Sequence, residues 1–371
     1  MEILQKLELP LIGGAFLAAA SSSLLYDYGR VLGCSGAIHS LLSGTYQSNK
    51  LALVLGLTFG GSGIRIGLPF LEKSLSRSFF DTSVLLHANH WQVLSILGLS
   101  GLLVGAGSKI GSGCTSGHML CGMARGSKRS WAATMVFFPV AILTHRIIKP
   151  FLYALLPQSH SINHVAFESK LAPLAIFLLG SPYLLYHLLK LTASSKRFEF
   201  LRTALLGATF ASGLALSGMT RPSVVLGFFD FFLPFWDPSL LGVALAGLGT
   251  NILVYLAVVK PKVIKWNRLK EEISKADDLT IEGLRQSFLV HAPNSCVQSE
   301  WQLPELSNTT IDRKLILGSA LFGMGWGLAG ICPGPGLVSL GAYPLSLGIW
   351  SWIAGFLVAG KLASVESRLR M

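Results

Sequence analysis

The sequence predicts an all-α integral membrane protein with about nine transmembrane helices, plus short re-entrant half-helices. Three observations support this fold class. Hydrophobic residues make up 51% of the 371 and charged residues only 13%, with a mean hydropathy of +0.57, whereas soluble domains carry roughly a quarter charged residues. Nine stretches approach the ~20 apolar residues that cross a bilayer. Glycine-rich breaks interrupt this apolar sequence. A large soluble all-α protein is the alternative, and nine such stretches in one short chain argue against it.

The predicted spans follow one another along the whole chain. The first comes after Glu2, Lys6 and Glu8 and lacks a small-residue cleavage site, so we expect it to be retained rather than removed as a signal peptide. The spans are expected at about 9–26, 51–70, 91–108, 130–149, 171–190, 200–218, 238–259, 313–330 and 344–362.

Basic residues cluster between these spans, and under the nine-span count every cluster falls on one side. The positive-inside rule makes that side cytoplasmic, so the N-terminus is expected outside and the C-terminus in the cytoplasm of a multi-pass cell-membrane protein. The net charge of +12 then reflects topology and not nucleic-acid binding, because the basic residues flank spans. The clusters are Arg125, Lys128 and Arg129; Lys190, Lys196, Arg197 and Arg202; Lys260, Lys262, Lys265, Arg268 and Lys270; and Lys361, Arg368 and Arg370.

Spans and breaks occur in the same order in two halves. We expect a first membrane repeat at 1–150, a linker with a joining helix at 151–199, and a second repeat at 200–371 that contains a hydrophilic cytoplasmic insert at 261–312. Because each half has four spans and one span joins them, the second half must enter the membrane from the opposite side. This predicts an inverted repeat, the arrangement of many transporters, with Cys114 and Cys332 as approximate mates.

Three breaks carry a cysteine each: Cys34, Cys114 and Cys332. Backbone at membrane depth can leave the helix only where protein or a water-filled cavity satisfies it, and the N-terminus of a following helix attracts anions. No carboxylate lies in these breaks, which argues against a metal-cation route. We expect substrate-binding support from Gly113, Thr115, Ser116, Gly117, His118, Cys121 and Gly334. Cys121 could instead only pack, and a disulfide among the cysteines stays open.

Longer motifs resemble a known family. Gly113-Cys114-Thr115-Ser116-Gly117-His118, Cys121-Gly122 and the span opened by Ser130 are similar to the signature of the YeeE/YedE membrane proteins, sulphur transport proteins that include thiosulfate importers. Five later segments resemble the companion half of the same family. They are Gly218-Met219-Thr220, Val225-Leu226-Gly227-Phe228-Phe229-Asp230, Trp236-Asp237-Pro238-Ser239-Leu240, Gly325-Trp326-Gly327-Leu328-Ala329-Gly330 and Cys332-Pro333-Gly334-Pro335. By this resemblance the chain looks like a fusion of both halves that covers nearly its whole length. The insert and the surroundings of Cys34 depart from the family pattern.

The resemblance implies an inverted-repeat transporter in which Cys34, Cys114 and Cys332 line the path and contact thiosulfate. We therefore expect a transporter of thiosulfate or a related sulfur-containing anion, with no catalytic residue, metal or cofactor. Its expected partners are that small anion, the lipid bilayer and a cytoplasmic sulfur-handling protein. The alternatives are a membrane sulfurtransferase that forms a cysteine persulfide, with His118 four residues from Cys114, and an ion channel or scaffold subunit. Residue types leave the choice among thiosulfate, sulfite and selenium analogues open.

Overall fold

The chain is an all-α membrane protein. The computed structural model describes residues 2–44, 47–81, 91–155, 170–192, 198–231, 236–273, 293, 301–303 and 310–369. Regular structure in these ranges is helical, apart from one isolated β-bridge between Arg30 and Gln302. Seven helices of the described residues are long and apolar enough to cross a membrane, which confirms the predicted fold class.

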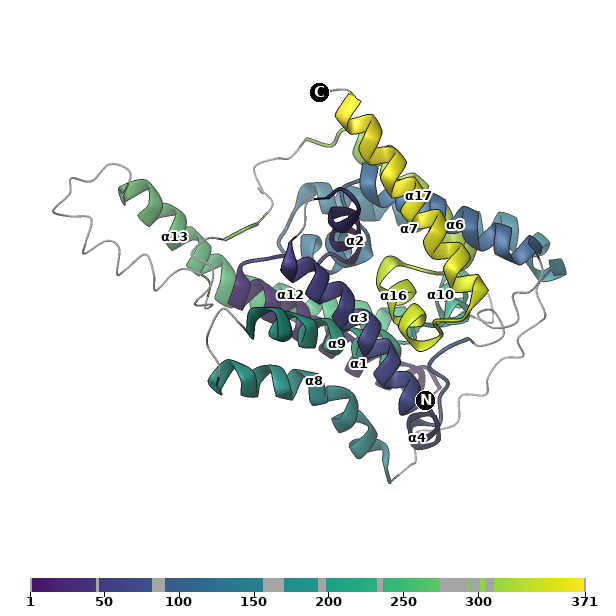
Figure 1. The fold of residues 1–371 in the computed structure, drawn as a ribbon, viewed down its shortest axis with the longest axis horizontal. Helices are drawn as coiled ribbons and strands as arrows, with labels where there is room; N and C mark the ends of the chain where they lie inside the picture. The colour runs from purple at the N-terminus through teal and green to yellow at the C-terminus, as the bar shows by residue number, and fades with distance from the viewer. Residues whose placement is uncertain are drawn as a thin grey trace.

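One bundle surrounds the first helix. α1 (Glu2–Tyr28) packs against α9 (Glu199–Leu216), and α9 packs against α3 (Ser48–Ile66) and against α8 (Ala172–Thr192) on its outer side (Figure 1). Glycines allow the close approach of α1 and α9, since a Cβ on Gly13 would lie 2.7 Å from the carbonyl oxygen of Gly213. The other face of α1 packs against a helical rod made of α11 (Ser239–Gly242), η3 (Val243–Leu248), α12 (Gly249–Val254), η4 (Tyr255–Val259) and α13 (Lys260–Ile273).

A second bundle holds the remaining long helices. α6 (Trp91–Ile110) packs against α17 (Leu347–Leu369) and α15 (Arg313–Ala329), and α15 packs against α7 (Lys128–Leu155). Glycine again sets the spacing. A Cβ on Gly105 of α6 would lie 2.9 Å from the Cα of Phe356 in α17, and one on Gly323 of α15 would lie 3.0 Å from the Cα of Phe137 in α7. These contacts bring backbones together, so side chains cannot rearrange to make room.

Short helices follow the glycine-rich breaks. They are α2 (Cys34–Leu42), η1 (Ser116–Met123), α10 (Pro222–Phe229) and α16 (Pro333–Ala342), and a further short helix, α4 (Leu68–Leu75), continues α3. α16 contacts α3 and α9 of the first bundle and α17 of the second (Figure 1). Gly330, with φ +67°, ends α15 in the left-handed conformation that glycine adopts without strain. The breaks thus lie between the two bundles.

The predicted spans agree in position with long helices throughout the chain. Seven meet the requirements for crossing a membrane, while α9 and α17 occupy the two other predicted ranges, 200–218 and 344–362. The count of nine stays a prediction. α13 covers the start of the expected insert, whereas Cys296 and most of residues 274–309 lie outside the described residues. The two predicted repeats do not form separate bodies, because each bundle contains helices from both.

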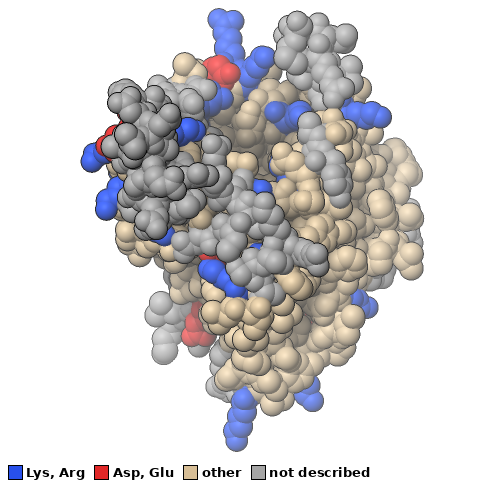
Figure 2. Space-filling view, turned by 60° about the vertical axis from the view of Figure 1, so that its left-hand side comes forward, with Lys and Arg blue, Asp and Glu red and all other residues tan. Residues whose placement is uncertain are grey.

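Basic residues from two of the predicted clusters meet at the end of α1. Lys190 Nζ donates to Asp27 Oδ1 over 2.6 Å, Lys262 Nζ donates to the Tyr26 hydroxyl over 3.1 Å, and the Arg202 guanidinium lies 5.9 Å from the centre of the Tyr28 ring. Figure 2 shows most of the Lys and Arg side chains of this face in its upper half, above a largely uncharged surface. These clusters therefore share one side of the molecule.

Candidate functional site

The three predicted path cysteines line one small cavity between the bundles. Its volume is about 30 Å³, and Cys34, Cys114 and Cys332 contribute to its wall together with Thr115, Ser116 and Gly334. All three thiols are free and buried. Residues 34, 114 and 332 come from separate breaks, so the fold unites parts of the chain that are far apart in sequence.

Helix starts position these thiols. Cys332 is the N-cap of α16, with Pro333 at its first position; proline suits that position because its missing N–H would be unpaired there. Cys34 is the first residue of α2, after the extended Gly33. Cys114 precedes the helical turn at Thr115 that leads into η1. Each cysteine therefore lies at or beside the start of a helix, where the backbone N–H groups of the first turn have no carbonyl partner within the helix.

Hydroxyl groups link the thiols. Ser116 Oγ lies 3.2 Å from Cys114 Sγ and also accepts a hydrogen bond of 3.2 Å from the backbone N–H of Cys34. Thr115 Oγ1 lies 3.5 Å from Cys332 Sγ. These contacts hold the three cysteines around two neighbouring hydroxyl groups, and hydroxyls can both donate and accept hydrogen bonds.

The cavity wall is otherwise apolar. Leu17, Phe210 and Leu214 contribute side chains, and no described residue of the wall is Asp, Glu, Lys, Arg or His. Two methionines, Met119 and Met219, add thioether sulfur to the three thiols. Sequence reasoning assigned neither methionine to the site. Met219 lies in the motif Gly218-Met219-Thr220, but methionine in an apolar stretch is common in packed cores.

A much larger cavity adjoins this one on the side of the basic clusters. Its volume is about 710 Å³, and we call it the vestibule. Gly33, Ser35, Gly113 and Gly117 line it, and these residues are the chain neighbours of Cys34, Cys114 and Ser116. The short helices therefore separate the vestibule from the central cavity. Among the described residues of its wall, the basic ones are Arg30, Lys50, Arg125 and Arg129, and none is Asp or Glu.

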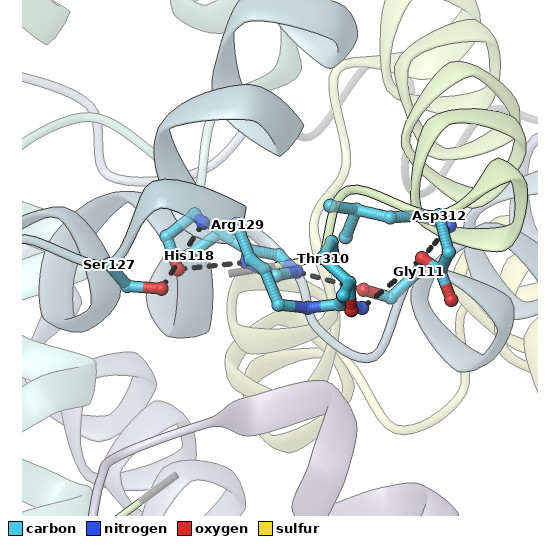
Figure 3. A network of polar contacts seen from close by, with 8 residues as sticks. Gly111, His118, Ser127, Arg129, Thr310 and Asp312 are labelled. Carbon is cyan, nitrogen blue, oxygen red and sulfur yellow. Dashed lines mark hydrogen bonds and ion pairs between the residues drawn. The ribbon is translucent and has the colours of Figure 1, made fainter. Parts of the chain in front are cut away.

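His118 lies in the wall of the vestibule, away from the thiols. Its Nε2 lies 3.0 Å from the carbonyl oxygen of Gly111, and its Nδ1 lies 3.2 Å from Ser130 Oγ. Figure 3 shows this ring held within a polar network that continues through Arg129 to Thr310 and Asp312. Gly113 lies against the ring. A Cβ at this position would lie 2.8 Å from Cδ2 and Nε2 of His118, so only glycine leaves room for the imidazole. His118 and Gly113 thus shape the vestibule.

Cys121 lies outside both cavities. It is buried in η1, its thiol lies 3.6 Å from the carbonyl oxygen of Leu32, and it is not in the wall of either cavity. Of the ten residues expected on or beside the path, the central cavity contains six and the vestibule contains Gly113, Gly117 and His118. Cys121 takes the packing alternative in this structure.

Relatives that are named probable transporters match about a third to two fifths of this chain. A "Probable transporter" of Xylella fastidiosa strain Temecula1 is 36% identical over 128 residues, which are 34% of this chain and 84% of the relative. Another of strain 9a5c is 35% identical over 158 residues, which are 42% of this chain and 86% of the relative. The chain belongs to this family of transporters. Residues 280–370 also match a family of unknown function, DUF6691.

As a member of a transporter family, the chain is a multi-pass membrane protein that moves a solute. The matched stretch is most of each relative but only about a third to two fifths of this chain, so these relatives are about half as long as this chain or shorter. No solved structure matches the chain.

Proposed function

We propose that this transporter takes up thiosulfate or a closely related sulfur-containing anion along a path lined by Cys34, Cys114 and Cys332. The observation that carries the proposal is the shared cavity: three thiols from three breaks line one space of about 30 Å³. A buried cysteine by itself is commonly a packing residue. Three cysteines that converge at helix starts, beside hydroxyl groups, are better explained as contacts for a soft, polarizable solute.

An inverted repeat accounts for the packing of the long helices. If α1, α3, α6 and α7 correspond to α9, the α11–α13 rod, α15 and α17, each contact has a counterpart: α6 with α17 matches α15 with α7, and α3 with α9 matches the rod with α1. The contact of α1 with α9 and the contact of α6 with α15 join helices that are counterparts of each other, so the repeat maps each of these contacts onto itself. The short helices are then re-entrant elements that approach the membrane centre from opposite faces.

The chemistry of the cavity fits the two ends of thiosulfate. Its sulfonate end takes hydrogen bonds from N–H and hydroxyl groups, which the helix starts, Thr115 and Ser116 supply. Its terminal sulfur is soft and can accept weak S–H hydrogen bonds from neutral thiols, which bind it loosely enough to let it leave. A cavity of about 30 Å³ holds about one or two water molecules, so the path is closed in this structure and must widen during transport.

A sulfurtransferase would need a base beside a reactive thiol. His118 is the candidate base in sequence, but its two ring nitrogens contact Gly111 and Ser130 and it lies in the vestibule wall. None of the described residues in the wall of the central cavity has a basic or an acidic side chain. These observations support transport without a covalent step, as do the names of the relatives.

Uptake into proteoliposomes tests the proposal. With thiosulfate labelled separately in each sulfur, both labels should enter together. We expect Cys114→Ala and Cys332→Ala to lower the uptake rate by about tenfold or more, because each loses a contact with the moving anion. Cys121→Ala is the matched control, since Cys121 is equally buried but lies outside both cavities, and it should keep wild-type uptake.

Two outcomes would contradict the proposal. Sulfite left outside with only one label inside would indicate sulfur transfer. Wild-type uptake by both alanine variants, with normal folding, would contradict the cysteine path.

The Cys114→Ser variant separates the softness of the sulfur from its hydrogen bonding, because serine keeps a donor. We expect this variant to transport sulfite better than thiosulfate.

A further inference from the structure

We propose that the vestibule contains a second binding site, for a tetrahedral sulfur oxoanion, centred on Lys50. This inference rests on the proposed function and extends it, because it places a waiting site between the cysteines and the basic side of the protein. Its first support is a built space: a cavity of about 710 Å³ is within the size range of small-molecule sites.

Charge in the vestibule wall is uniformly positive. Within the described part of the chain, four basic side chains and no carboxylate line it. Two of the four are neutralised by partners from outside the wall: Arg30 Nη1 lies 2.9 Å from Glu199, and Arg129 Nη2 lies 3.4 Å from Asp312. These pairs contribute shape and hydrogen-bonding capacity but little net charge.

Lys50 differs from these two arginines. It lies in the first turn of α3, where its backbone N–H bonds Asn49 Oδ1 and the carbonyl oxygen of Gln47. Its amino group forms no ion pair or hydrogen bond with any described residue, and the side chain is half-buried at the cavity. A half-buried cation without a counter-ion attracts an anion, because the surrounding low-dielectric protein screens its charge weakly.

Uncharged donors surround the same space. Ser35, Ser112 and Asn49 line the vestibule, and a tetrahedral oxoanion presents several oxygens that accept such hydrogen bonds. Arg125, a buried guanidinium at the end of η1, lies in the same wall. An anion that leaves the thiols of Cys34 and Cys114 therefore enters a space with positive potential and many donors, which lowers the cost of leaving the apolar centre.

The site can be tested without the cysteines. In a purified Cys34→Ala, Cys114→Ala, Cys332→Ala variant, we expect thiosulfate and sulfate both to bind, as measured by calorimetry, while chloride at equal ionic strength does not compete. Adding Lys50→Gln should raise the Kd about tenfold or more, and Lys50→Arg should restore most of the affinity, because the charge returns. Lys6→Gln is the control, since Lys6 is also half-buried and lies outside the vestibule wall.

The readout is separate from transport. If the variant without cysteines binds neither thiosulfate nor sulfate, or if Lys50→Gln leaves both Kd values unchanged while circular dichroism shows normal folding, the second site is wrong. Chloride that competes as well as sulfate would also overturn it. Loss of uptake in the single cysteine variants with retained anion binding here would support both proposals, whereas retained uptake would overturn only the cysteine path.

Discussion

At the scale of single residues, the central cavity depends on the absence of side chains as well as on thiols. Gly334 in α16 contributes to the cavity wall and faces Cys34. A Cβ at this position would lie 3.3 Å from Cys34 Sγ and 3.2 Å from Cδ1 of Leu214. Both neighbours are side-chain atoms, so the fold can accommodate a methyl group there by small shifts, but only at the expense of the cavity.

Gly334→Ala should therefore lower uptake while the protein stays folded. We expect the maximal uptake rate to fall about tenfold, because the added methyl group occupies the space that the anion must enter. Gly249→Ala is the control, since a Cβ on Gly249 of α12 meets nothing within 4 Å. Uptake at the wild-type rate by Gly334→Ala would show that the anion does not pass this cavity.

At the scale of elements, glycines on the long helices determine which backbones meet. Gly105 joins α6 to α17, and Gly323 joins α15 to α7. These two interfaces are counterparts under the proposed repeat. Because the nearest atoms belong to the backbone of the partner helix, an added methyl group forces the two helices apart. Such overpacking lowers the stability of the protein, because a close-packed core has no free space for the added group.

Gly105→Ala and Gly323→Ala should each destabilise the protein. We expect a loss of about 1–3 kcal/mol, measured as a lower midpoint of thermal unfolding in detergent, with similar losses in the two variants if the repeat is correct. Gly63→Ala on α3 is the control, because its Cβ would meet nothing within 4 Å, and alanine there should be neutral or slightly stabilising. An unchanged midpoint in both variants would contradict the close packing of these helices.

At the scale of the whole molecule, much of the architecture could be predicted from sequence, and the reasons are local. Apolar runs of membrane length predict helices because a lipid-exposed backbone must satisfy its own hydrogen bonds. The breaks at Cys114 and Cys332 were predictable because glycine and proline oppose a continuous helix. The convergence of the cysteines on one cavity was inferred from the order of the parts and the family resemblance, and the structure brings them together.

Other features depend on contacts that sequence patterns do not reveal. Lys50 looks like an ordinary charge beside a span. That no described residue pairs with it, whereas Arg30 and Arg129 have acidic partners, is visible only in the structure. The two bundles mix helices from both halves, which division of the chain into consecutive repeats does not suggest. Cys121 shares a motif with Cys114 but lies outside the cavities, because η1 directs its thiol to the carbonyl oxygen of Leu32.

Orientation in the membrane decides what the vestibule does. The positive-inside rule predicts that the basic side, and with it the vestibule, faces the cytoplasm. With that orientation an anion would pass the cysteines first and reach Lys50 afterwards. A fluorescent protein fused after Met371 should then fluoresce. In a cysteine-free background, Glu2→Cys should react with a membrane-impermeant maleimide in intact cells. The opposite labelling pattern would place the vestibule outside, where Lys50 would collect the anion before the thiols instead of receiving it after them.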